Sequence, residues 1–418
     1  MMVSEFMTNG QTARASRAPG VKTAVIWTSL GPYHYSRLQA ARKLGRVDCV
    51  EIYASDTNRP WAKLPNEGGN ARVTLFDRRP ERGVSTADMT AHLESALDQL
   101  APDVLIVPSW GEKYALIALR WCLRRGVRPV VMTDTTASDK QRVWYMEFVK
   151  RRLLRYFNMA FVSGHRSSLY LQSLGFTNGR IVQGLNAVDN DFFAAEVQRA
   201  TAEKEKWRKQ FGLPERFILG VFRFAPEKNL PGLVRAYSVY RQRIKDRALP
   251  LVLVGDGPER DGFEEILKSE GVADSVILAG FRQYGEIGGF YGLATAFVLP
   301  SISESWGYVV NEAAASGLPL LVSSQCGCSD DLVRDGVNGW TFDASDWQRL
   351  AGLFELVTVG KCDLRAMGAA SRKVVSTFSL SAFAENYWEA VHRATQYATV
   401  PCAPADAALL SFLIRLRN

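Results

Sequence analysis

The sequence contains 418 residues, of which 47% are hydrophobic and 22% are charged. This length suits two domains of about 200 residues each, and the apolar content excludes a disordered chain. The net charge of +8 and the pI near 9.1 are compatible with an anionic ligand or an anionic membrane surface. Nucleic acid is not an expected partner, because no nucleic-acid-binding motif is present and the cations are not gathered in one segment.

Residues 1–20 are polar and lack the apolar core of a secretory signal, so we predict a disordered leader. No stretch reaches the roughly 18 apolar residues that a helix needs to span a bilayer. We therefore expect a cytoplasmic protein, either soluble or peripheral at the inner membrane face. The six cysteines lack paired metal-ligand spacing, so we expect reduced thiols. Cys326-Gly-Cys328 as a metal pair is the less favoured alternative.

Residues 21–195 predict an N-terminal Rossmann-like domain, in which short apolar strands alternate with helices. The predicted strands are 22–27, 47–53, 104–107 and 129–132. The predicted helices are 35–44, 86–100, 116–125 and 144–157. Residues 58–83, which are rich in Pro, Gly, Asn and Arg, predict a long loop. Gly31 lies in the turn after the first strand, at the edge where open parallel sheets place their ligands.

Residues 196–216 predict a charged helix and linker, and residues 217–380 predict a second Rossmann-like domain. Its predicted strands are 217–222, 251–254, 276–278, 296–299 and 320–323. Its predicted helices are 230–245, 261–270, 285–293 and 309–316. Helices alternating with short apolar strands indicate a parallel sheet that is covered on both faces. Residues 381–418 predict a last helix and a tail.

The loop before the predicted helix 309–316 carries the first chemical signal. Glu304 lies in the loop, and Glu312 lies on the helix that follows. The free backbone amides around Gly307 form a positive site suited to phosphate. A carboxylate beside that site would repel phosphate, so it should accept hydrogen bonds from sugar hydroxyls. Ordinary solvated acids near a helix N-terminus are the alternative interpretation.

Two further segments favour the interpretation of Glu304 and Glu312 as ligand-binding residues over that of solvated acids. Arg223 and Lys228 follow an apolar strand, and Gly255-Asp-Gly-Pro258 ends the next strand in a tight turn. The three segments resemble the donor half of the retaining glycosyltransferases of family 4, which carry an R-x4-K pair, a GDGP turn and an E-x7-E loop. The resemblance covers roughly residues 21–394 and is strongest over 217–342. It implies a GT-B fold, which is an α/β fold. Two Rossmann-like parallel-sheet domains face each other across a cleft, and a C-terminal helix crosses back to the first domain.

This resemblance also implies roles for individual residues. Arg223 and Lys228 would hold the diphosphate of a nucleotide sugar donor, Glu304 the hydroxyls of the transferred sugar, and Glu312 the ribose. The other expected donor-binding residues are Gly31, Gly257, Phe281, Arg282, Gly307, Tyr308 and Val309. Transfer would proceed with retention at the anomeric carbon. Because the two cations and the helix amides supply positive charge, we expect no metal and no cofactor.

The acceptor side departs from the family pattern. Relatives often carry a histidine in the loop after the strand predicted at 129–132, where this sequence has Asp134. We predict acceptor-side positions at His34, Asp134 and His165. An ordinary surface histidine at a helix start is the favoured alternative for His165.

The expected acceptor is a glycan, a lipid-linked sugar or a small molecule, in envelope or exopolysaccharide biosynthesis. The predicted helix 144–157 carries four cations, which point either to a solvated face or to contact with anionic lipid. These cations are Lys150, Arg151, Arg152 and Arg155. Two other functional classes remain open. One is another GT-B enzyme, such as a sugar-nucleotide epimerase or a phosphorylase, and the other is an inactive GT-B scaffold.

Overall fold

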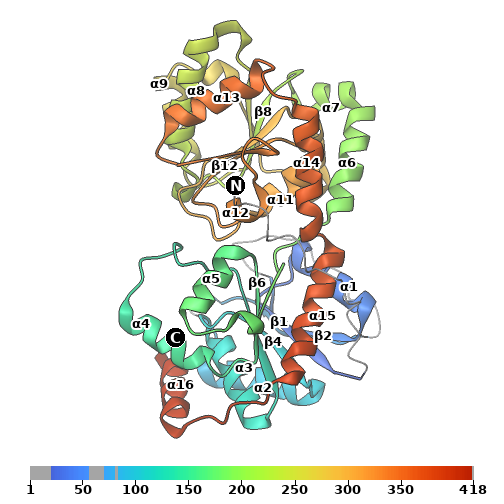
Figure 1. The fold of residues 1–418 in the computed structure, drawn as a ribbon, viewed down its shortest axis with the longest axis vertical. Coiled ribbons are helices and arrows are strands. Elements are labelled where there is room, and N and C mark those ends of the chain that lie inside the picture. The colour runs from blue at the N-terminus through green and yellow to red at the C-terminus, as the bar shows by residue number, and fades with distance from the viewer. Residues whose placement is uncertain (1–19, 56–69, 81–82, 417–418) are drawn as a thin grey trace, which may run out of the picture.

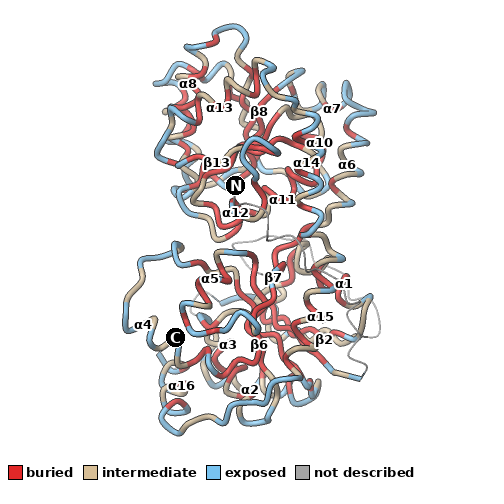
Figure 2. Tube along the Cα trace, in the orientation of Figure 1, coloured by how far each residue is buried: buried red, intermediate tan, exposed pale blue. Residues whose placement is uncertain are grey.

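The structure, a computed structural model, describes residues 20–55, 70–80 and 83–416. Apart from Gly20, the predicted leader lies outside these residues, as does most of the predicted loop 58–83. Two parallel sheets organise the described part of the chain (Figure 1). Figure 2 shows that the buried segments are concentrated in these sheets and in the helix faces packed against them.

The first sheet has seven strands in the order β3-β2-β1-β4-β5-β6-β7. The strands are β1 (Thr23–Trp27), β2 (Val47–Ser55), β3 (Arg72–Arg78), β4 (Val104–Pro108), β5 (Arg128–Thr133), β6 (Met159–Val162) and β7 (Ile181–Gln183). Its first five helices in chain order are α1 (Pro32–Leu44), α2 (Thr86–Leu100), α3 (Lys113–Arg125), α4 (Trp144–Leu154) and α5 (His165–Ser173). Successive side chains of β1 belong alternately to two apolar cores, Ala24 and Ile26 to one and Val25 and Trp27 to the other. Both faces of the sheet are therefore buried.

The second sheet has six strands in the order β10-β9-β8-β11-β12-β13. They are β8 (Ile218–Val221), β9 (Leu251–Val254), β10 (Val276–Gly280), β11 (Ala296–Leu299), β12 (Leu320–Ser323) and β13 (Gly339–Phe342). The helices around it are α6 (Asn190–Ala202), α7 (Lys204–Phe211), α8 (Leu230–Ile244), α9 (Arg260–Ser269), α10 (Tyr284–Leu293), α11 (Tyr308–Ala315), α12 (Ser329–Leu332), α13 (Trp347–Thr358) and α14 (Leu364–Val375). All pairings in both sheets are parallel, as the alternating pattern predicts.

After α14 the chain returns to the first sheet through α15 (Leu380–Gln396), which lies beside α1 (Figure 1). The indole Nε1 of Trp388 donates to the carbonyl of Ala41 at 2.9 Å, and the hydroxyls of Tyr387 and Thr23 lie 3.0 Å apart. A further helix, α16 (Pro404–Leu416), packs against α3 and α4. The predicted fold, two Rossmann-like domains with a C-terminal helix that crosses back, is confirmed.

Two details differ from the prediction. Residues 196–216 do not form a linker, because α6 and α7 pack on the second sheet's helix α10. The Trp207 and Phe211 rings stack 5.2 Å apart, and Phe211 meets Phe290 of α10 at 5.1 Å. Helix α6, which begins at Asn190 within the range predicted for the first domain, thus packs with the second. The second difference is strand β3, which lies inside the predicted loop 58–83 and pairs at the sheet edge with β2.

Candidate functional site

The loop that joins β11 to α11 lies between the two sheets and is held by backbone contacts. The carbonyl of Glu304 accepts from the amide of Gly327 at 2.8 Å. Gly307 caps α11 with a φ of 106°, which residues with a side chain rarely adopt, so glycine starts the helix at this position. The next two residues face different cavities, since Tyr308 lines one pocket and Val309 lines another. The start of α11 thus lies at the boundary of both.

The pocket that Val309 lines, called the C-terminal pocket below, has a volume of about 670 Å³. It contains six of the predicted site residues, which are Arg223, Gly257, Phe281, Arg282, Val309 and Glu312. The GDGP turn forms one wall because its glycines approach other backbone closely. A Cβ on Gly255 would lie 1.9 Å from the carbonyl oxygen of Phe222, and one on Gly257 2.2 Å from that of Phe224. Larger residues at these two positions would displace the wall.

The cations of the predicted R-x4-K pair lie in different surroundings. Arg223 is exposed on the wall of the C-terminal pocket. Lys228 ends a short 3-10 turn, and its ammonium group forms an ion pair with the carboxylate of Glu304. The side chains of this pair are 13% and 23% exposed, so water screens the pair only partly. The cation expected to hold phosphate and the carboxylate expected to hold sugar thus form an ion pair with each other.

Glu312 is 1% exposed, and its carboxylate accepts hydrogen bonds from both domains. The hydroxyl of Tyr33, on α1 of the first domain, donates to Glu312 Oε1 at 2.5 Å. The hydroxyl of Tyr291, on α10, donates to Oε2 at 2.7 Å. Burial raises the pKa of the Glu312 carboxyl to about 7, although both hydrogen bonds oppose this shift. Tyr33 was not among the predicted site residues, although it follows the predicted turn at Gly31 by two positions.

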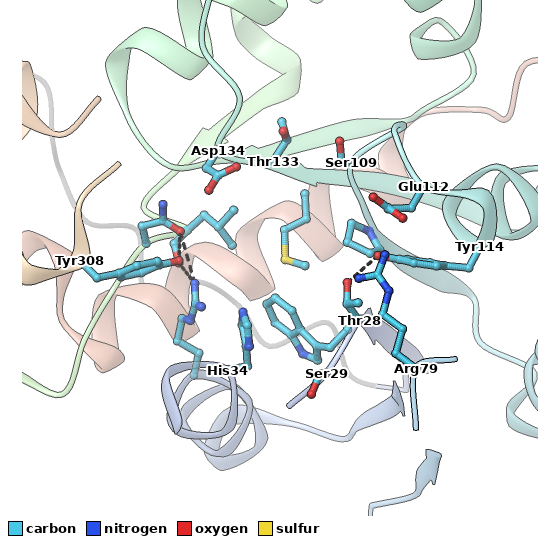
Figure 3. A pocket seen from close by; sticks show the side chains of 16 residues that line it. Thr28, Ser29, His34, Arg79, Ser109, Glu112, Tyr114, Thr133, Asp134 and Tyr308 are labelled. Atoms are coloured by element: carbon cyan, nitrogen blue, oxygen red, sulfur yellow. Dashed lines mark hydrogen bonds between the residues drawn. The ribbon is translucent and has the colours of Figure 1, made fainter. Parts of the chain in front are cut away.

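The pocket that Tyr308 lines, called the N-terminal pocket, has a volume of about 430 Å³. It lies at the carboxyl ends of β1, β4 and β5, where parallel sheets place ligands. Figure 3 shows Asp134, Thr133 and Ser109 on one side of this pocket, opposite His34 and Thr28. Burial raises the pKa of the Asp134 carboxyl. Two of the three predicted acceptor-side residues are therefore brought together.

The third acceptor-side candidate, His165, is not in the N-terminal pocket. Its exposed side chain starts α5, and its backbone amide donates to the carboxylate of Asp331 in the other domain at 3.1 Å. His165 follows β6, which lies beyond β5 and three positions from β1 in the sheet, and its side chain is exposed instead of facing the pocket. Gly31 also lines neither pocket and instead precedes α1 as its N-cap.

The two pockets meet at a pair of stacked rings. Tyr33 lines the C-terminal pocket and Tyr308 lines the N-terminal one, and their ring centroids lie 5.2 Å apart at an interplanar angle of 7°. The hydroxyl of Tyr308 donates to Asn186 Oδ1 at 2.6 Å, and Arg37 donates to the neighbouring carbonyl of Leu185 at 2.8 Å. This wall lies between the expected nucleotide side and the expected acceptor side.

Within the described residues, no three His, Cys, Asp or Glu side chains gather into a cluster that could hold a metal ion. Cys326 and Cys328 are buried beside the loop of Glu304, and burial raises the pKa of both thiols. Their packing contributes to the core of the second domain.

Comparison with known proteins identifies the second domain. Residues 203–374 match the family model for glycosyl transferases group 1. The chain is 26% identical over 262 residues to a GDP-mannose-dependent α-(1-6)-phosphatidylinositol monomannoside mannosyltransferase from Mycolicibacterium smegmatis. It is 33% identical over 215 residues to a D-inositol 3-phosphate glycosyltransferase from Salinispora arenicola. These alignments cover 60% and 47% of this chain.

The same alignments span only 66% and 47% of the two relatives' own lengths. The whole architecture matches a sucrose-phosphate synthase from Thermosynechococcus elongatus with a TM-score of 0.71 and 17% identity, over 90% of this chain and 99% of the other. At this identity the likeness concerns the fold. The protein therefore has the GT-B fold, and residues 203–374, in its second domain, match the glycosyl transferases group 1.

Proposed function

We propose that this protein transfers a glycosyl group from a nucleoside diphosphate sugar to an acceptor hydroxyl, with retention at the anomeric carbon and without a metal ion. The observation that carries the proposal is that Arg223 and Glu312 line one pocket, while the ion pair of Lys228 and Glu304, which lines neither described pocket, lies beside the start of α11. A group 1 glycosyl transferase domain over residues 203–374 supports the reaction class. The names of the relatives, which include a GDP-mannose-dependent enzyme, support a nucleotide sugar as the donor class.

The reaction breaks the bond between the anomeric carbon and the diphosphate oxygen, so negative charge grows on the leaving diphosphate. Arg223 offers a planar fork to two phosphate oxygens, and Lys228 offers a compact charge. Because Lys228 is paired with Glu304 in the free protein, donor binding would exchange that carboxylate for phosphate. The exchange would release Glu304 to accept hydrogen bonds from the hydroxyls of the sugar. One ion pair thus prepares both the phosphate and the sugar subsites.

The acceptor would occupy the N-terminal pocket. Its wall combines aromatic rings, including Trp27 and Tyr114, with the polar side chains of His34, Glu112 and Asp134. Sugars are bound by this combination, since their C–H faces pack on rings while their hydroxyls need hydrogen-bond partners. The pocket therefore supports a glycan or a lipid-linked sugar as the acceptor. A role in envelope or exopolysaccharide synthesis is part of this proposal.

The reaction can be tested with a panel of UDP- and GDP-sugars in the presence of EDTA. We expect one sugar to be transferred at an unchanged rate when the divalent metal is removed, because protein cations supply the charge. Nuclear magnetic resonance of the product should show the anomeric configuration of the donor. A rate that vanishes with EDTA and returns with Mg²⁺ or Mn²⁺ would contradict the metal-free proposal, and an inverted product would contradict retention.

We also propose that the protein associates peripherally with an anionic membrane at the inner face. No helix in the described ranges has the length and apolar character needed to span a bilayer. The four cations predicted to contact lipid are largely engaged within the protein. Lys150 pairs with Glu147 at 2.6 Å, and Arg152 pairs at 2.5 Å with Asp406 of α16, which is 1% exposed.

Exposed aromatic side chains instead support the membrane proposal. Four large side chains at the start of α4 project into solvent, and they are Trp144 (81% exposed), Tyr145 (55%), Met146 (49%) and Phe148 (54%). Trp and Tyr favour the interface of a bilayer, and nearby cations favour anionic lipid. The preceding segment begins at Thr133 and Asp134 of the N-terminal pocket, so this surface adjoins the proposed acceptor site in sequence.

Replacing Trp144 and Phe148 together with Ser should lower binding to phosphatidylglycerol vesicles about tenfold or more, since burying each such side chain contributes about 1.5–3 kcal/mol. Flotation or sedimentation of vesicles measures the change, and added salt should weaken wild-type binding. Val337→Ser, which alters a 56% exposed side chain in the other domain, is the matched control. Unchanged binding by the double variant, or no binding by the wild type, would contradict the proposal. Replacing Arg152 would confound the result, because it would remove the shortest ion pair of the buried Asp406.

A further inference from the structure

A hydrogen bond between the two domains lies inside the C-terminal pocket. Its donor is the hydroxyl of Tyr33 at the start of α1, and its acceptor is Glu312 Oε1 on α11, 2.5 Å away and 279 residues later in the chain. Both residues line the pocket. The pKa of Tyr33 is raised well above its usual value by burial and by the Glu312 carboxylate, so the phenol keeps its proton and remains a donor.

This bond leaves Glu312 little capacity to bind a ligand. One carboxylate oxygen accepts from Tyr33 and the other from Tyr291, and the side chain is 1% exposed. Each carboxylate oxygen keeps a second lone pair, so what a ribose hydroxyl lacks is space beside this buried side chain. A nucleotide can therefore reach Glu312 only when one of the two phenols leaves it.

The two phenols differ in their ability to move. Tyr291 is fully buried within the core of the second domain and comes from α10, which packs beneath the same pocket. Tyr33 comes from the other domain and is partly buried at the margin of that core, where its ring stacks on Tyr308 and meets Tyr284 edge-on at 5.9 Å. Removing Tyr33 from Glu312 requires a shift of the first turn of α1, whereas removing Tyr291 would disrupt a core. Tyr33 is thus the phenol that can leave.

We propose that Tyr33 is a gate for the nucleotide, occupying on Glu312 the place that a ribose hydroxyl takes in the complex. The inference rests on the proposed function, because it takes the C-terminal pocket as the nucleotide site. Donor binding exchanges a bond between the domains for a bond to the ligand. Since the competent state is then only partly populated in the free protein, the gate lowers the apparent nucleotide affinity. The same exchange couples nucleotide binding to a change in how the two domains meet.

Tyr33→Phe and Tyr291→Phe form a matched pair, because each removes one hydroxyl from Glu312 and keeps the ring. Calorimetry with UDP and with GDP gives the affinity of each variant for whichever nucleotide binds the wild type more tightly. Tyr33→Phe should bind about three- to tenfold more tightly than the wild type. Tyr291→Phe should bind more weakly, because its hydroxyl supports the carboxylate in the complex as well. The gain from Tyr33→Phe should disappear with the 2′,3′-dideoxy form of the same nucleotide, which cannot compete for Glu312.

Equal or weaker binding by Tyr33→Phe would overturn the gate, and the proposed function would stand if the wild type binds the nucleotide. A gain that persists with the dideoxy nucleotide would also overturn it, because the phenol would then be acting on something other than the ribose. A wild-type protein that binds neither nucleotide would overturn both the gate and the proposed donor site. Thermal melting of the two variants checks that the fold is retained, as expected when the stacked ring remains.

Discussion

Arg223→Ala and Lys228→Ala should each lower the rate of glycosyl transfer about a hundredfold or more, with the fold retained. Removing one preorganised donor that stabilises developing negative charge typically costs about 3 kcal/mol of transition-state stabilisation. Arg223 is exposed on the pocket wall, so its loss should leave the surrounding packing unchanged. Lys228 has a second role as the partner of Glu304, so its loss also leaves that carboxylate without a cation. Steady-state kinetics with saturating donor measure both effects.

Arg243→Ala provides a matched control. This residue lies near the end of α8 and donates to the side chain of Gln348 in an exposed contact, outside both pockets. Its replacement should leave transfer within about twofold, as for most surface substitutions. Near-normal turnover in a folded Arg223 or Lys228 variant would contradict the assignment of these cations to the diphosphate.

Several of the predicted site residues lie in the loops that follow strands of the second sheet. Arg223 follows β8, Gly257 follows β9 and Glu304 follows β11. In a parallel sheet all three strand ends lie at one edge, so order and spacing suffice to bring these residues together. The same argument placed Asp134 after β5. Local pattern and sheet topology therefore determine much of the candidate site.

The contacts that the sequence did not predict depend on how the domains face each other. The bond from Tyr33 to Glu312 joins residues 279 positions apart, and no local pattern indicates it. The charge of residues 196–216 predicts a solvated helix and linker, but Trp207 of α7 is buried. Strand β3 was missed because an edge strand is mostly partly exposed and lacks a continuous apolar run. In each case, contacts with residues distant in sequence determine the structure, and the local composition does not indicate them.

The two carboxylates of the central loop should differ in what their loss affects. Glu312→Gln should weaken binding of the free nucleoside diphosphate about tenfold or more, since a hydrogen bond to a charged acceptor contributes about 1.5–3 kcal/mol. A Gln amide also presents N–H groups where Tyr33 and Tyr291 already donate. Glu304→Gln should leave nucleotide affinity unchanged or slightly higher, because it releases Lys228 for phosphate. The same variant should lower transfer and reduce the discrimination among donor sugars.

The pH dependence of binding provides an independent check on Glu312. Its pKa is raised to about 7 in the free protein, and ribose hydroxyls that donate to the carboxylate favour the charged form. Wild-type affinity should therefore fall as the pH drops below about 7, where the protonated form prevails. The diphosphate also takes up a proton, near pH 6 by analogy with other phosphates, but this affects wild type and Glu312→Gln alike. Calorimetry between pH 5.5 and 8.5, a range of about three units around that pKa, should thus show a steeper fall for the wild type than for the Gln variant. Parallel profiles, or an affinity loss in Glu304→Gln alone, would show that Glu312 does not bind the ribose.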